Sequence, residues 1–150
     1  MLASKKKFRN CSEIYTDASR DEIRRVCSFA VYLKDLKRCY SGIIRNCVLS
    51  DKAEFYGIFY ALIFAEKLKV KNPVIYTDSL NSCSRIKAQS KKEFVDSEEM
   101  LNIFELMKST KAKIIWVPSH VGIHGNEIAD KSARKCLDNL LKDFVGIKVT

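Results

Sequence analysis

The sequence predicts an α/β protein with a mixed five-stranded sheet, in which a three-strand antiparallel meander is joined by parallel strands and helices cover both faces. Three observations support this fold class. The first third of the chain holds three segments rich in β-branched and aromatic residues, joined by short polar connections. The remainder alternates between strand-like runs and apolar segments with helical spacing. The tetrapeptide Ile-Tyr-Thr-Asp occurs twice, at 14–17 and 75–78.

The meander is predicted from three consecutive strands. The first strand starts at Ser12 and is expected to end at Asp17. The second covers 26–34 and the third covers 38–46. Only the polar segment Asp-Leu-Lys separates the second from the third, which predicts a hairpin.

Helices and strands alternate after the meander. A long apolar helix is expected after Ser50, which would serve as its N-cap, and the Asn-Pro pair at 72–73 ends it. On the helix expected at 79–88, Leu80, Cys83 and Ile86 are expected to lie on one side. This helix follows a strand expected at 74–77. Next come a helix from Asp96 or Ser97 to Lys108 and a strand at 112–118. A glycine-containing loop then leads to a last helix from Asn126.

The length suits a single domain, which we expect at 12–142 between a basic tail at 1–11 and a C-terminal tail at 143–150. Lys and Arg total 27 against 18 Asp and Glu, so the formal charge is +9. This surplus favours a polyanionic partner, with nucleic acid ahead of an anionic membrane. A membrane-surface protein would carry a basic amphipathic helix, whereas these helices have faces suited to burial, so no membrane partner is expected.

The six cysteines point to a reducing compartment. None forms a C-x-x-C pair, and no Cys/His spacing is typical of a zinc site. The N-terminus runs into Lys5, Lys6 and Lys7 without the apolar segment of a secretory signal. We therefore expect an intracellular protein with reduced thiols, in either the nucleus or the cytoplasm.

The repeated tetrapeptide predicts a pair of neighbouring carboxylates. A right-handed crossover through a helix would place its two copies on adjacent parallel strands, with Asp17 and Asp78 about 5 Å apart in the backbone. Ligand sites in open α/β sheets lie at the carboxyl ends of strands. Two carboxylates this close repel unless a cation lies between them, and Mg²⁺ favours such oxygen ligands. The alternative is coincidence, because Thr-Asp-Ser is also common turn chemistry.

Two further acids extend this pattern. Glu54 lies in the first turns of a nearly all-apolar helix, where a charge needs a partner or an ion. Asp130 lies in the last helix, soon after the glycine loop. Considered alone, the Glu54 carboxylate could simply be stabilised by the positive N-terminal end of its helix dipole. Asp130 could lie on a solvated helix face.

Four segments together resemble a known family, type I ribonuclease H, and in particular the ribonuclease H domains of retroviral and non-LTR retrotransposon reverse transcriptases. The segments are YTDAS (15–19), AEFYGIFYAL (53–62), IYTDS (75–79) and WVPSHVGIHGNEIADKSA (116–133). The last segment is the most specific, since it joins a Trp-Val-Pro-x-His motif to a Gly-Asn-Glu-x-x-Asp motif. The resemblance implies the ribonuclease H-like form of the mixed sheet.

The resemblance implies specific roles for these residues. The metal-binding and catalytic acids would be Asp17, Glu54, Asp78 and Asp130, and His120 would be the family's mobile histidine. The implied activity is cleavage of RNA paired to DNA with two Mg²⁺ ions, or Mn²⁺ as a substitute, leaving 3′-hydroxyl and 5′-phosphate ends. The implied partners are an RNA/DNA hybrid and a reverse transcriptase domain in the parent polypeptide.

Polar residues near the acids are candidates for nucleic-acid contacts. They are Ser19, Ser50, Asn81 and Asn126. Ser50 could instead only cap its helix, and Asn126 could only hold its loop. His120 could be a solvated loop histidine, and a zinc role with His124 is disfavoured because glycines interrupt the helix that such a pair would need.

The chain also departs from the family pattern. Ala18 replaces a glycine common in relatives, which makes close approach of the RNA backbone less assured. Asn81 stands where several relatives carry tyrosine. The lysine-rich insertion of cellular members is absent, so we expect weak hybrid binding that a neighbouring reverse transcriptase domain supports. The N-terminal basic residues Lys5 to Lys7 and Arg9, with Lys91 and Lys92, could compensate in part.

Other functions are compatible with parts of the pattern. An integrase or transposase of the same superfold would place its third acid on a late helix and would lack Glu54. A catalytically weak or inactive nucleic-acid-binding remnant of a retroelement polyprotein is the main alternative. The presence of all four acids argues against it.

Overall fold

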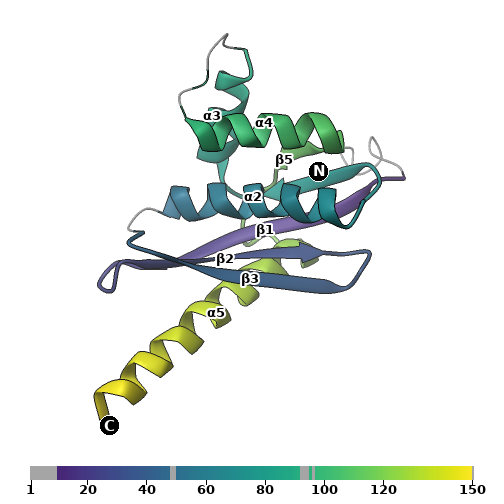
Figure 1. The fold of residues 1–150 in the computed structure, drawn as a ribbon. Coiled ribbons are helices and arrows are strands. Elements are labelled where there is room, and N and C mark those ends of the chain that lie inside the picture. The colour runs from purple at the N-terminus through teal and green to yellow at the C-terminus, as the bar shows by residue number, and fades with distance from the viewer. Residues whose placement is uncertain (1–9, 48–49, 92–94, 96, 150) are drawn as a thin grey trace.

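The structure is a computed structural model that describes residues 10–47, 50–91, 95 and 97–149 (Figure 1). Its elements are β1 (Ser12–Asp21), β2 (Val26–Leu33), β3 (Arg38–Arg45), α2 (Ser50–Lys67), β4 (Pro73–Thr77), α3 (Leu80–Gln89), α4 (Glu98–Thr110), β5 (Lys113–Trp116) and α5 (His124–Val149). The expected roles of the N-terminal basic residues, of Lys92 and of a cap at Asp96 lie outside the described residues.

One mixed sheet organises these elements, in the order β3-β2-β1-β4-β5. The strands β1, β2 and β3 pair antiparallel, and β4 pairs parallel to both β1 and β5. In the parallel pair, Ile14 lies beside Ile75 and Thr16 beside Thr77. The two copies of the tetrapeptide are therefore in register, as the crossover argument predicts, and the predicted fold class is confirmed.

The strand β1 is longer than predicted. We expected it to end at Asp17, but it continues to Asp21, because β2 is long enough to pair with it from Asp17 opposite Ala30 to Asp21 opposite Val26. On the other side, β4 ends at Thr77. Asp17 therefore lies inside a strand, at the point where its parallel neighbour stops.

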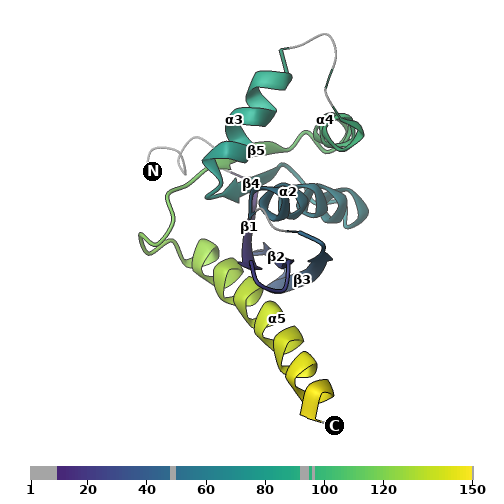
Figure 2. The same cartoon turned by 90° about the vertical axis from the view of Figure 1, so that its left-hand side faces the viewer.

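Helices cover both faces of the sheet, as the two views in Figures 1 and 2 show. The helices α2 and α4 pack over one face, and α5 crosses the other beneath β1, β2 and β3. Alternation along the strands sends Ile14 and Ile75 to the α2 side, and Tyr15 and Tyr76 to the α5 side. The larger core, on the α2 side, also includes Val31, Ile58, Leu62, Met100 and Ile103, each exposed by 0%.

The helix ends can be compared with the predictions. Ser50 is the first residue of α2, and its side chain lies outside the described set, so its capping role stays a prediction. Ser97 caps α4 by accepting a hydrogen bond from the Met100 N–H at 3.2 Å. On α3, Ile86 is buried, whereas Leu80, the first residue of the helix, is 58% exposed. The helix α5 starts at His124, two residues earlier than expected.

No helix among the described residues has both the length and the hydropathy needed to cross a bilayer.

Candidate active site

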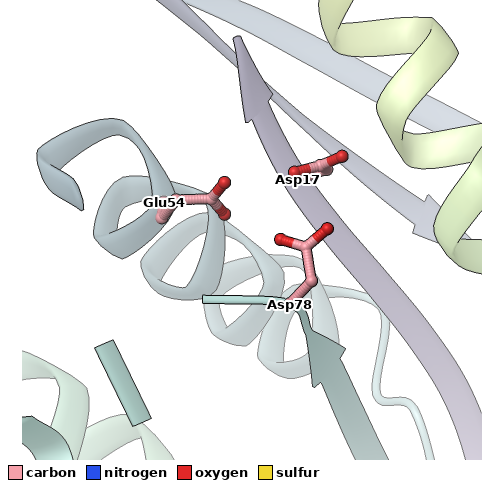
Figure 3. Close-up of side chains that lie close together, drawn as sticks. All are labelled: Asp17, Glu54 and Asp78. Atoms are coloured by element: carbon pink, nitrogen blue, oxygen red, sulfur yellow. The ribbon is translucent and has the colours of Figure 1, made fainter. Parts of the chain in front are cut away.

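Three of the predicted acids converge at one end of the sheet. Asp17, Glu54 and Asp78 each place a carboxylate oxygen within 4.8 Å of those of the other two. Figure 3 shows the three side chains pointing toward one another from β1, α2 and the end of β4. Because these segments are far apart in the sequence, only the folded chain creates this cluster.

The ends of the neighbouring elements determine where each acid lies. Since β4 stops at Thr77, no strand covers β1 at Asp17 on that side. Asp78 is the next residue of the chain, and Ser79 then caps α3 by accepting a hydrogen bond from the Ser82 N–H at 3.2 Å. Glu54 reaches the same opening from the first turns of α2. The end of β4 and the first turns of α2 therefore meet the middle of β1.

Asp17 and Glu54 lie in an environment that disfavours their charge. Burial and the nearby Asp78 carboxylate raise the pKa of Asp17 to about 7, although the Ala18 N–H donates a hydrogen bond to it at 2.8 Å. Burial, Asp17 and Asp78 together raise the pKa of Glu54 well above its ordinary value. The buried Oε2 atom of Glu54 has no hydrogen-bond partner among the described residues. Such a cluster is stabilised either by protons or by bound cations.

A first prediction concerns the stability of the metal-free protein. Its free energy of unfolding is expected to fall as pH rises from about 4 to about 7, because folded Asp17 keeps a proton that the unfolded residue has already lost. We expect a decrease on the order of 2 kcal/mol across this range. Urea unfolding in a chelating buffer at several pH values measures it.

The matched variant is Asp17→Asn, which is similar in shape and does not titrate. It should flatten the pH dependence and be more stable than the wild type at neutral pH in the chelating buffer. An equally steep fall of stability in this variant would show that Asp17 is not the group responsible.

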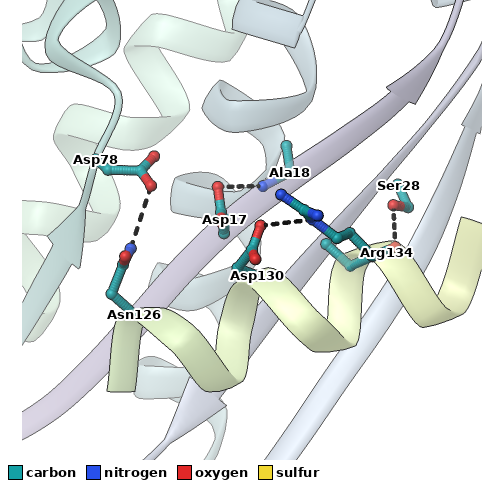
Figure 4. Close-up of polar contacts among 8 residues, drawn as sticks. Asp17, Ala18, Ser28, Asp78, Asn126, Asp130 and Arg134 are labelled. Carbon is teal, nitrogen blue, oxygen red and sulfur yellow. Dashed lines mark hydrogen bonds and ion pairs between the residues drawn. The ribbon is translucent and has the colours of Figure 1, made fainter. Parts of the chain in front are cut away.

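Asp130 lies near the three acids but has a different partner. It lines the same pocket as Asp17 and Asp78, and its charge contributes to the raised pKa of Asp17. The Arg134 Nε donates to Asp130 Oδ1 at 3.1 Å across one turn of α5 (Figure 4). The structure thus brings three of the four predicted acids together and pairs the fourth with a cation.

Asn126 connects α5 to the cluster. Its side chain is 3% exposed, and its Nδ2 donates to Asp78 Oδ2 at 3.2 Å (Figure 4). Farther along α5, the carbonyl of Ala133 accepts a hydrogen bond of 2.5 Å from the Ser28 hydroxyl of β2. These two bonds attach α5 to the site and to the sheet.

A pocket of about 600 Å³ opens beside the acids. Among the predicted residues, Ser19 and His120 line it together with Asp17, Asp78 and Asp130. His120 is exposed and has a φ of 55°, a left-handed conformation uncommon for residues other than glycine. The imidazole therefore lies at the rim of the pocket, on the loop between β5 and α5.

The remaining candidate that the structure describes, Asn81, lies beside the acids at a second pocket. Asn81 is exposed and donates to Asp51 Oδ2 at 3.2 Å, and it lines a smaller pocket with Glu54 and Asp78. Among the described residues, the only group of three or more potential metal ligands is the acidic triad. It contains neither His120 nor His124, so the described residues offer no zinc cluster built on this pair.

Sequence reasoning missed two residues that contact the predicted acids. The spacing of four residues between Asp130 and Arg134 could have indicated their ion pair, because such residues are neighbours on a helix. The indole N–H of Trp116 donates to the backbone carbonyl of Asp78 at 3.3 Å. Nothing in the sequence indicated this bond, since it depends on the pairing of β4 with β5.

Comparison with known proteins places this arrangement in a family. Ribonuclease H1 of Mus musculus is 24% identical over 98 residues, which cover 57% of this chain. The aligned part is 34% of the mouse protein, so the chain spans about a third of this curated relative. The family model for RNase H matches residues 9–138, which is most of the chain and includes all four predicted acids. The chain therefore belongs to the RNase H family.

Proposed function

We propose that this protein is an endoribonuclease that hydrolyses the RNA strand of RNA/DNA hybrids and leaves 3′-hydroxyl and 5′-phosphate ends. The observation that carries the proposal is the cluster of Asp17, Glu54 and Asp78 within 4.8 Å in a member of the RNase H family. The related mouse protein is named Ribonuclease H1. The formal charge of +9 suits a nucleic-acid substrate.

The cluster fits divalent cations. All three members are carboxylates, which are the oxygen ligands that Mg²⁺ and Mn²⁺ prefer. Among the described residues no Lys or Arg forms an ion pair with any of the three, and Glu54 Oε2 has an unused lone pair. A pair of bound ions would supply an activated water and stabilise the charge that develops on the departing 3′ oxygen.

The positions of the acids suggest how they divide this task. Asp17 lies within 4.8 Å of Glu54 and Asp78, and Asp130 helps to raise its pKa, so Asp17 would contact both ions. Glu54 and Asp78 would hold the ion on the leaving-group side, and Asp130 would help to hold the other. His120, at the rim of the pocket, would move a proton or assist product release.

We also propose that the chain comes from the replication machinery of a retroelement and acts beside a reverse transcriptase domain inside the cell. This origin is supported by the two joined motifs in residues 116–133, which resemble retroviral and non-LTR retrotransposon sequences. A neighbouring domain would provide the hybrid contacts that the lysine-rich insertion of cellular members would otherwise make.

The function is tested with end-labelled duplexes of one sequence, made as RNA/DNA hybrid, double-stranded RNA and double-stranded DNA. With Mg²⁺, cleavage is expected only in the RNA strand of the hybrid, and a chelator should abolish it. Product ends are identified by whether a polymerase extends them. Cleavage of the DNA strand, or cleavage that persists in the chelator, would contradict the proposal.

A further inference from the structure

The one tryptophan of the chain lies beside the acidic cluster and remains open to solvent. Trp116 ends β5 and is 44% exposed. Its indole N–H donates to the backbone carbonyl of Asp78 at 3.3 Å, which fixes the ring next to a residue of the site. A large aromatic side chain that is half exposed and held in one orientation is suited to contact a ligand.

Other apolar side chains are exposed on the segments around Asp78. Leu80 follows it by two residues and is 58% exposed, and Val121 follows His120 and is also 58% exposed. Together with Trp116, they account for three of the seven large apolar side chains that the described residues expose. The segments that carry Asp78 and His120 therefore expose apolar as well as polar side chains.

We propose that Trp116 is a substrate-contact residue whose ring packs against the sugar of a nucleotide next to the cleaved bond. This inference rests on the proposed function, because a hybrid is the ligand considered. In an A-like duplex the wide and shallow minor groove presents sugars to a protein surface. Phosphates approach cations, whereas the hydrocarbon face of a sugar suits an indole ring.

The inference also accounts for the bond between the indole and Asp78. A ring hydrogen-bonded to the backbone of Asp78 has a fixed position relative to that acid. Trp116 would therefore align the strand along the site. Its contact would affect where the hybrid is cut as well as how tightly it binds.

The first experiment uses Trp116 as its own reporter. As the chain has no other tryptophan, emission excited at the red edge of the absorption band comes from this residue alone. The protein carries Asp17→Asn to prevent cleavage, and it is titrated with hybrid while anisotropy of a labelled hybrid records binding. Emission should change in parallel with binding. Unchanged emission at saturation would overturn the inference, whether or not the wild type cleaves hybrid.

The second experiment separates contact from a structural role. Trp116→Phe keeps an aromatic ring but loses the N–H, whereas Trp116→Leu loses both. If the ring contacts the sugar, Trp116→Leu should raise KM for hybrid cleavage by about fivefold to tenfold and Trp116→Phe by much less. A role limited to holding Asp78 predicts equal losses of kcat in both variants with KM unchanged, and that outcome overturns the inference.

The matched control is Leu36→Ser, which removes a side chain of similar exposure. Leu36 is 47% exposed in the turn between β2 and β3, at the end of the sheet away from Asp17. It should leave KM unchanged. An equal rise of KM in Leu36→Ser would show that any exposed apolar side chain has the effect. Cleavage by the wild type without any difference among these variants would reject the role of Trp116 and leave the proposed function standing.

Discussion

Replacing Asp17 with Asn is expected to lower the rate of hybrid cleavage by about a thousandfold or more while the protein stays folded. Asp17 is 5% exposed, lies within 4.8 Å of both Glu54 and Asp78, and has a pKa that Asp130 also helps to raise, so it is the acid that we propose contacts both ions. An amide is a weaker ligand than a carboxylate and carries no charge to balance a cation. The Asn side chain can still accept the Ala18 N–H bond, which preserves the local backbone.

The loss should be shared by Asp78→Asn, because both residues belong to the cluster. Asp138→Asn is the matched control, since Asp138 lines the same pocket outside the triad and is exposed. Its rate should stay within about threefold of the wild type, as for most surface substitutions. Rates are compared under single-turnover conditions, with circular dichroism as the check of folding. A wild-type rate in Asp17→Asn, or an equal loss in Asp138→Asn, would contradict the assigned roles.

Most of this site can be predicted from the sequence, because the alternation that marks each strand is visible within a few consecutive residues. Both copies of the tetrapeptide have the alternation of a strand, and the intervening helix makes them parallel. The register that places Thr16 beside Thr77 then follows from matching the two apolar patterns. The position of Glu54 could be predicted less directly, since it rests on a charge in an apolar helix together with the resemblance to a family.

Other features depend on contacts that no local pattern contains. The extension of β1 to Asp21 requires the whole length of β2 as a partner, and the sequence around Asp17 gives no sign of it. The exposure of Leu80 depends on where α3 begins relative to the sheet. The bond from Trp116 to Asp78 depends on the register of β4 with β5. Long-range pairing determines each of these, whereas periodicity reports only on neighbours along the chain.

The second large effect is expected at Gly125, in the first turn of α5. A Cβ atom there would lie 2.3 Å from two ring atoms of Tyr15, far inside van der Waals contact. The ring cannot move aside easily, because Tyr15 is 2% exposed, stacks on Tyr76 at 5.0 Å and donates its hydroxyl to Glu13 at 2.9 Å. Gly125→Ala should therefore lower the free energy of unfolding by about 3 kcal/mol, at the upper end of overpacking costs.

Gly57→Ala is the matched control, since Gly57 is also a buried helical glycine. A Cβ atom there would meet the Thr16 Cβ at 3.5 Å, an ordinary contact. Because alanine has a higher helix propensity than glycine, this variant should be as stable as the wild type or more stable by up to about 1 kcal/mol. Urea unfolding of both variants measures the difference. Equal stabilities of the two would show that α5 moves away from Tyr15 without cost.

The same substitution links the fold to the site. To accept a methyl group at position 125, α5 must move away from Tyr15, and Asn126 and Asp130 move with it. The bond from Asn126 to Asp78 would then lengthen. Cleavage by Gly125→Ala, measured where the variant is still folded, should therefore fall well beyond the small loss of folded protein. A rate that only follows the folded fraction would mean that the contact of α5 with Tyr15 stabilises the fold without positioning the acids.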